Sequence, residues 1–200
     1  MSIIITIGRE FGSGGRELGK RIAEQLGIAY YDKEIVDEIS KKTDLAFDYV
    51  QQIVEQKPLV YYPITIGTSF SAVGTNVNKN STSVYVEQSN VIKEMAQKSD
   101  CVIVGRCADY ILKDMNPFRI FVYSDMNSKM KRCREKGEVD SDISDRKLFK
   151  MIKGIDKNRS RYYEFYTSLK WGDPLNYDLM INTSNKTIKE VVNEIVKIVK

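Results

Sequence analysis

The stretch IIITIGREFGSGGRELGKRIAEQLG, residues 3–27, decides the fold of this 200-residue chain. It begins with an apolar run, continues through a glycine-rich turn, and ends in a segment where Leu18, Ile22 and Leu26 repeat every four residues. This order predicts a buried strand, a loop and an amphipathic helix, which is the arrangement of a phosphate-binding loop. The lysine that such loops carry is not at its usual place.

Further short apolar runs alternate with helical patterns along the chain. Together with residues 3–7, they span residues 28–31, 101–105, 119–123 and 178–181. Near-continuous apolar runs are typical of strands buried on both faces of a parallel sheet. We therefore expect an α/β fold with three layers, α/β/α, and a five-stranded parallel sheet. A last helix is predicted to begin at the capping box Thr187-x-x-Glu190.

Composition limits the classes of protein to consider. With 42% hydrophobic and 29% charged residues, the chain is expected to form one domain over residues 1–200. A net charge of +4, from 31 Lys and Arg against 27 Asp and Glu, is too small to indicate a dedicated nucleic-acid binder. No apolar run approaches the roughly 20 residues that span a bilayer, so we expect a cytoplasmic protein without a membrane partner.

The absence of histidine narrows the chemistry. The three cysteines, Cys101, Cys107 and Cys133, form no CxxC pair. Structural zinc and Ser–His or Cys–His catalysis are therefore excluded, and the cysteines are expected to be reduced, packed thiols. Any catalysis must use Arg, Lys, Asp, Glu, hydroxyl groups or a bound metal.

Residues 58–86 depart from the α/β alternation. They are rich in Ser, Thr, Asn, Gly and Tyr and show no helical period. We expect a mobile excursion or a small hairpin outside the core, as a surface loop, a subunit contact or part of a lobe that closes on substrate.

The glycines of the first turn indicate a phosphate site. Glycine permits positive φ and lets an anion approach backbone N–H groups, and a helix N-terminus adds unpaired N–H groups and a positive dipole end. Gly12, Gly14 and Gly15 lie between the predicted strand and helix, and Arg16 opens the helix. We expect this loop to bind phosphate, with a tight structural turn as the alternative.

Arg106 follows directly after a predicted strand, in the segment IVGR. Open parallel sheets bind ligands at the carboxyl ends of their strands, so Arg106 is expected to face the same cleft as the glycine loop. The alternative is a surface arginine paired with Asp109.

The segments GREFGSGGRELGKRIAEQLGIAYYDKEI and VIVGRCADYIL resemble the cytidylate kinase-like family, an offshoot of the P-loop nucleoside monophosphate kinases. The similarity extends over nearly the whole chain and is weakest at residues 38–90. It implies a P-loop fold with a small lid and acceptor lobe, a variable excursion at about 40–90 and a lid at about 132–161. It also implies ATP and Mg²⁺ as cofactors and nucleotide substrates as partners, and a homodimer is compatible with it.

Cytidylate kinases carry a loop of the form G-x-G-K-G-T. Alignment with GSGGRE places Gly12 and Gly14 on the two glycines, Gly15 on the lysine, Arg16 on the next glycine and Glu17 on the hydroxyl residue. The lysine normally neutralises phosphoryl charge and the hydroxyl holds Mg²⁺. We therefore expect Arg16 to replace the lysine, and Ser13 or Glu17 to contact the metal.

The same resemblance assigns Arg106 to the phosphate of the acceptor. Asp32, in YYDKEI, resembles an aspartate that helps to form the acceptor site, although an Asp before a helix is also an ordinary N-cap. The expected lid arginines are Arg132, Arg134, Arg159 and Arg161, unless they are solvated charges on helix faces. Arg16, Arg106 and Arg159 are the candidates for catalysis.

Three functions fit these features. The first is ATP-dependent phosphoryl transfer to a nucleoside monophosphate, with CMP or dCMP as the expected acceptor. The second is a nucleotide-binding sensor without transfer activity, which would account for the lost lysine. The third is a small-molecule kinase of the same fold.

Overall fold

The computed structural model describes residues 3–55, 75–137, 139–140 and 142–199. Its five strands form one sheet in the order β2-β3-β1-β4-β5, and every neighbouring pair is parallel. The strands are β1 (Ile4–Arg9), β2 (Ala29–Tyr31), β3 (Cys101–Val104), β4 (Phe118–Tyr123) and β5 (Leu179–Asn182). They lie at the five apolar runs, so the predicted five-stranded parallel α/β fold is confirmed.

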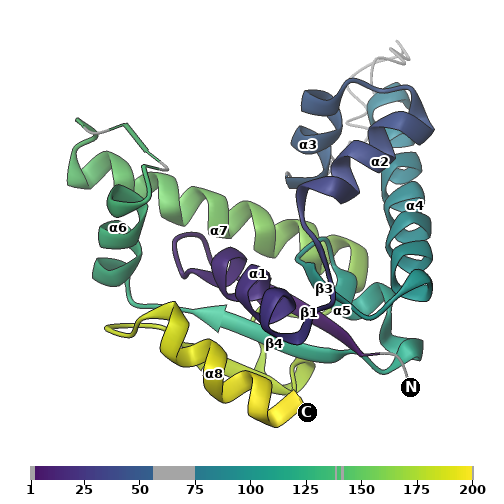
Figure 1. Ribbon diagram of the computed structural model, residues 1–200. Coiled ribbons are helices and arrows are strands. Elements are labelled where there is room, and N and C mark those ends of the chain that lie inside the picture. The colour runs from purple at the N-terminus through teal and green to yellow at the C-terminus, as the bar shows by residue number, and fades with distance from the viewer. Residues whose placement is uncertain (1–2, 56–74, 138, 141, 200) are drawn as a thin grey trace.

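Helices α1 (Gly15–Leu26) and α8 (Ile188–Val199) pack together against one face of the sheet (Figure 1). Their buried side chains include Leu18, Ile22 and Ile195, and these meet Ile5 and Ile7 of β1. The capping box of α8 forms as predicted. The Thr187 backbone N–H donates to Glu190 Oε2 at 3.2 Å, and the Glu190 N–H donates to Thr187 Oγ1 at 3.4 Å.

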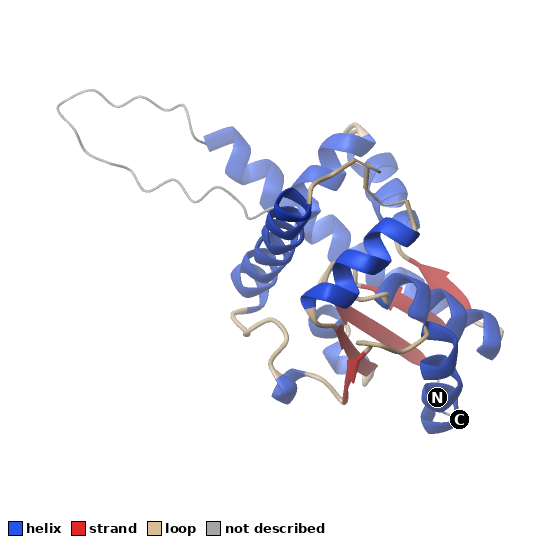
Figure 2. Ribbon diagram, turned by 90° about the vertical axis from the view of Figure 1, so that its left-hand side faces the viewer, coloured by secondary structure: helices blue, strands red, loops and turns tan. Residues whose placement is uncertain are grey.

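The opposite face carries a second core. Its helices include α2 (Lys33–Thr43), α3 (Phe47–Glu55), α4 (Thr75–Lys98) and α5 (Ala108–Ile111). Figures 1 and 2 show α2, α3 and α4 grouped as a lobe beside the sheet. Two short 3₁₀ turns, η1 (Lys113–Met115) and η2 (Pro174–Asn176), complete the connections.

Helices α6 (Met126–Glu135) and α7 (Asp145–Thr167) lie where the lid was expected. A small third core, formed by Cys133 of α6 with Leu148 and Ile152 of α7, joins the two helices. Helix α7 contacts α6 near one end and α3 nearer the other (Figure 1). It therefore links α6 to the lobe of α2–α4.

The expectation for residues 58–86 is wrong for its last part, because α4 begins at Thr75 and extends to Lys98. Val84 is fully buried, and the ring of Tyr85 stacks on that of Tyr166 with centroids 3.9 Å apart. The buried face also includes Ser81 and Gln88. Polar residues at helical spacing hid the period that apolar residues would have displayed. Residues 58–74 lie outside the described residues.

All three cysteines are buried thiols that form no disulfide, as the sequence predicts. Within the described ranges, no helix combines the length and the apolar character needed to cross a membrane.

Candidate functional site

The glycine loop joins β1 to α1 and is held by its own backbone geometry and by a neighbouring helix. Gly14 is the N-cap of α1 with φ of 83°, and a Cβ there would lie 2.5 Å from Ile188 Cδ1. The Phe11 N–H donates to Asp156 Oδ1 of α7 at 2.6 Å. The conformation that exposes the first N–H groups of α1 is thus secured from both sides.

A buried lysine completes this support. Lys129 of α6 places its Nζ 2.7 Å from Glu10 Oε2 and 3.0 Å from Asp156 Oδ2. Glu10 Oε2 also accepts a hydrogen bond from the Ser124 N–H at 3.1 Å. The loop, the end of β4, α6 and α7 are therefore joined by one charged network.

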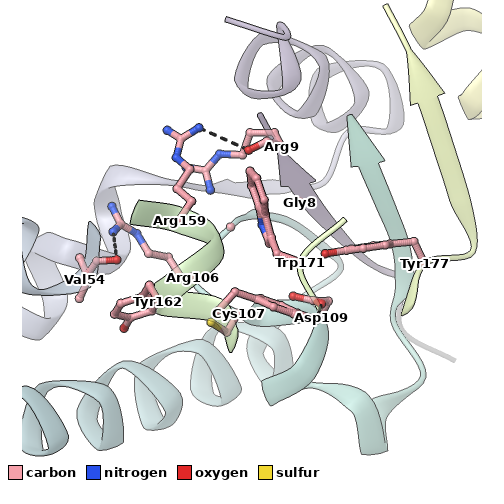
Figure 3. A pocket seen from close by; sticks show the side chains of 12 residues that line it. Gly8, Arg9, Val54, Arg106, Cys107, Asp109, Arg159, Tyr162, Trp171 and Tyr177 are labelled. Atoms are coloured by element: carbon pink, nitrogen blue, oxygen red, sulfur yellow. Dashed lines mark hydrogen bonds between the residues drawn. The ribbon is translucent and has the colours of Figure 1, made fainter. Parts of the chain in front are cut away.

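Two pockets adjoin the carboxyl ends of the strands. The loop pocket lies along the glycine loop and is lined by Arg9, Glu10, Phe11, Gly12, Gly14, Gly15, Arg16, Glu17, Arg132, Lys136 and Arg159. The strand-end pocket, seen in Figure 3, is lined by Gly8, Arg9, Val54, Gly105, Arg106, Cys107, Asp109, Arg159, Tyr162, Tyr163, Trp171 and Tyr177.

Two arginines line both pockets, Arg9 at the end of β1 and Arg159 of α7. Arg159 Nη1 donates to the Arg9 carbonyl oxygen at 3.3 Å (Figure 3), and its guanidinium lies 5.7 Å from the centre of the Phe11 ring. Burial and the nearby charge of Arg159 lower the pKa of Arg9 to about 9. A group that reaches from one pocket to the other would pass these two cations.

Arg16, the cation expected to replace the lysine, is directed to Asp32. The Arg16 Nε lies 2.5 Å from Asp32 Oδ2, and the Arg16 side chain is 51% exposed. Asp32 stands at the N-cap position of α2 without a side-chain capping bond. Its carboxylate instead forms ion pairs with Arg16 and with Arg9, whose Nη2 lies 3.8 Å from Asp32 Oδ1.

Arg106 follows β3 and is buried rather than on the surface. Its Nη1 donates to the Val54 carbonyl oxygen at 3.2 Å, and the Gln88 amide donates to the Arg106 carbonyl oxygen at 2.9 Å. Asp109 accepts a hydrogen bond from Tyr163 at 2.6 Å, and burial raises the pKa of this carboxyl. The strand-end pocket therefore combines cationic groups with one acid whose charged form is disfavoured.

The residues expected to contact a metal have other partners. The Ser13 hydroxyl is buried and donates to the Glu10 carbonyl oxygen at 2.8 Å. Glu17 lines the loop pocket but pairs with Lys136 and with Arg21, which lower its pKa against the effect of burial. In the part of the chain that the structure describes, no three His, Cys, Asp or Glu residues gather as a metal site.

The four arginines predicted for a lid divide into two pairs. Arg132 and Arg159 line the loop pocket, and Arg132 Nη1 donates to the Gly12 carbonyl oxygen at 2.7 Å. Arg134 instead pairs with Asp145 at 2.5 Å, and Arg161 is exposed. Only the first pair is brought to the glycine loop.

Arg9 lines both pockets and is not among the site residues predicted from the sequence. A signal was available, because Arg9 is a charged residue that directly follows an apolar strand and directly precedes the glycine turn. The usual loop pattern draws attention to the first turn of the helix, whereas this cation comes from the strand.

Comparison with known proteins bears on the family and the fold of this chain. A family model described as "Cytidylate kinase-like family" matches residues 4–185. The chain is also similar to an uncharacterized protein from Eubacterium ventriosum with a crystal structure, at 32% identity and a TM-score of 0.71, covering 99% of this chain and 98% of that one. No functionally curated protein matches the sequence.

More distant solved structures share the fold. Shikimate kinase from Acinetobacter baumannii, solved with shikimate, is 14% identical with a TM-score of 0.56, covering 100% of this chain and 93% of that one. A gluconokinase from Sinorhizobium meliloti is 11% identical with a TM-score of 0.54, covering 98% and 91%. At these identities the likeness concerns the fold alone.

Proposed function

This chain belongs to the cytidylate kinase-like family, and on that basis we propose that it is an ATP-dependent kinase that phosphorylates a nucleoside monophosphate, with CMP or dCMP as the acceptor. The observation that carries the proposal is the pair of adjoining pockets that share Arg9 and Arg159. Transfer between two substrates requires two neighbouring sites with positive charge at the junction, where negative charge is concentrated during the reaction.

ATP suits the loop pocket because its phosphates would meet the N-terminus of α1 and the side chain of Arg132. Side chains at Gly12 or Gly14 would collide with Cys133 or Ile188, so the loop backbone stays uncovered. Mg²⁺ commonly binds through phosphates, water and one or two carboxylates, and Glu17 is a carboxylate in this pocket. When bound, the metal would neutralise charge on the phosphates.

The strand-end pocket suits the acceptor. Arg106 lines it and offers a cation for the monophosphate. Tyr162, Trp171 and Tyr177 line the same pocket and supply aromatic surface for a nucleobase (Figure 3). In the transfer, an oxygen of the acceptor's phosphate forms the new bond to the terminal phosphorus of ATP. The bond from that phosphorus to the bridging oxygen breaks, and its electron pair leaves with ADP.

The proposal is tested by coupled ADP-release assays with ATP and Mg²⁺ across CMP, dCMP, UMP, AMP and GMP. Shikimate and gluconate serve as non-nucleotide acceptors. We expect turnover to be fastest with CMP or dCMP. Nucleotide binding by calorimetry without turnover on any acceptor would favour a sensor, and selective turnover of shikimate or gluconate would favour a small-molecule kinase.

Arg106→Ala is expected to raise the KM for the acceptor about tenfold or more, because one charge-assisted contact contributes roughly 1.5–3 kcal/mol. ATP affinity should stay close to that of the parent. Arg106→Lys should recover part of the loss, and Lys113→Ala, at an exposed position beyond α5, serves as the control. Since Arg106 also donates to the Val54 carbonyl, the unfolding midpoint of each variant is measured as well. An unchanged KM for the acceptor would remove Arg106 from this role.

A further inference from the structure

Gly15 occupies the position where related loops carry lysine, and the structure shows which side chain fills the adjacent space. A Cβ built at Gly15 would lie 2.5 Å from Arg9 Cβ, 3.1 Å from Arg9 Cγ and 3.3 Å from Val122 Cβ. Real Cβ atoms essentially never come within 3.0 Å of such an atom, so the 2.5 Å approach to Arg9 Cβ is excluded. No side chain therefore fits at Gly15 while Arg9 keeps its present position.

Gly105, at the end of β3, makes room for the other end of the same side chain. A Cβ there would overlap Arg9 Nη1 and lie 2.7 Å from Arg9 Cζ. The Gly105 N–H donates to the Ile7 carbonyl oxygen at 2.9 Å, which keeps the ends of β1 and β3 side by side. Two glycines far apart in sequence thus leave space for one arginine, Gly15 along its stem and Gly105 under its guanidinium.

Few groups of the protein compensate the positive charge of the Arg9 guanidinium. Its side chain is 11% exposed, and its ion pair with Asp32 spans 3.8 Å. Within the described part of the chain, its guanidinium donates no hydrogen bond to the protein. Arginine remains protonated at neutral pH in proteins, even where burial and Arg159 disfavour its charge. An anion between the two pockets would relieve this cost.

We propose that Arg9 takes over the work of the missing loop lysine by binding the terminal phosphate of ATP and neutralising its charge during transfer. The assignment rests on the proposed function and adds to it a catalytic residue supplied by the strand before the loop. Arg9 lines both pockets, whereas Arg16 is half-exposed and directed to Asp32. The planar guanidinium can contact two phosphate oxygens at once, which a lysine ammonium does not do in a fixed geometry.

The first test compares ATP with ADP. In calorimetry, Arg9→Ala should weaken ATP binding about tenfold or more and leave ADP binding nearly unchanged, because only ATP carries the terminal phosphate. Turnover should fall by about 10²-fold. Arg16→Ala should affect the ratio of the two affinities less. Lys20→Ala, which removes a positive charge from a side chain of α1 that is 67% exposed, is the control for net charge.

The second test moves the cation back to the loop. Gly15→Lys alone should abolish turnover, because the new side chain collides with Arg9. Alanine at position 9 would retain the colliding Cβ, so the lysine is combined with Arg9→Gly. We expect the double variant Arg9→Gly/Gly15→Lys to recover at least tenfold of the turnover that Arg9→Gly loses.

Three results would overturn the assignment. The first is an ATP-to-ADP affinity ratio in Arg9→Ala equal to that of the parent, and the second is a larger effect of Arg16→Ala on that ratio. The third is a double variant that unfolds at the parent's temperature and recovers no turnover. The affinity ratio is measured without an acceptor. A chain that fails to phosphorylate any acceptor would therefore contradict the proposed function and still leave Arg9 testable.

Discussion

Arg159→Ala is expected to lower kcat by about 10²–10³-fold, the loss typical of removing one preorganised group that stabilises transition-state charge. Arg159 lines both pockets, and its guanidinium donates to the Arg9 carbonyl oxygen beside the junction. Charge spreads over the transferring phosphoryl group only during the reaction. The affinities for ATP and for the acceptor should therefore change less than kcat.

The measurement is steady-state ADP release at saturating substrate, with binding followed by calorimetry. Lys157→Ala is the matched control, because Lys157 is an exposed cation on the same helix two residues earlier. Arg159 also lies over the Phe11 ring, so the unfolding midpoint must be shown to stay near that of the parent. A kcat equal to that of the control would mean that Arg159 does not meet the reacting phosphate.

Lys129→Met should have the largest effect on stability, lowering the free energy of unfolding by about 3–5 kcal/mol. The Lys129 side chain is 6% exposed and lies between the carboxylates of Glu10 and Asp156. Without the ammonium group, two carboxylates would face each other in a largely buried position. Because Asp156 also accepts the Phe11 N–H, the glycine loop should lose order and ATP affinity should fall with stability.

Urea denaturation measures this loss, and Lys131→Met provides the control. Lys131 lies on the same helix, its side chain is 76% exposed, and its ion pair with Glu135 spans 3.8 Å. Exposed pairs contribute little, so this variant should stay within about 0.5 kcal/mol of the parent. Equal effects of the two substitutions would show that the buried network around Lys129 does not stabilise the loop.

The strands could be predicted because their signal is local. Each apolar run becomes a strand, and CVIV at Cys101–Val104 is buried along its whole length. The start of the last helix could be predicted equally well, since Thr187 and Glu190 need only each other to cap it. The beginning of α4 could not be predicted from the sequence. Its buried face presents Ser81 and Gln88. The Gln88 side chain acquires its role only through partners on other elements, Arg106 and Tyr162.

The candidate site likewise has parts that the sequence predicts and parts that it does not. Glycine spacing identified the loop, and the strand-end rule identified Arg106. The contact of Arg106 with Val54 of α3 and the direction of Arg16 toward Asp32 after β2 depend on tertiary packing. Neither follows from spacing along the chain.

By itself, the sequence determined a parallel α/β fold with a glycine loop at the first strand end, because hydrophobic period and backbone freedom are properties of neighbouring residues. The tertiary structure decided which cation lies between the two pockets. Arg9, Gly15 and Gly105 share one space only because β1, α1 and β3 meet at the same edge of the sheet. The absence of a side chain at Gly15 is explained by the Arg9 side chain, which comes from β1 and occupies the adjacent space. Only tertiary packing brings Gly15 and Arg9 together.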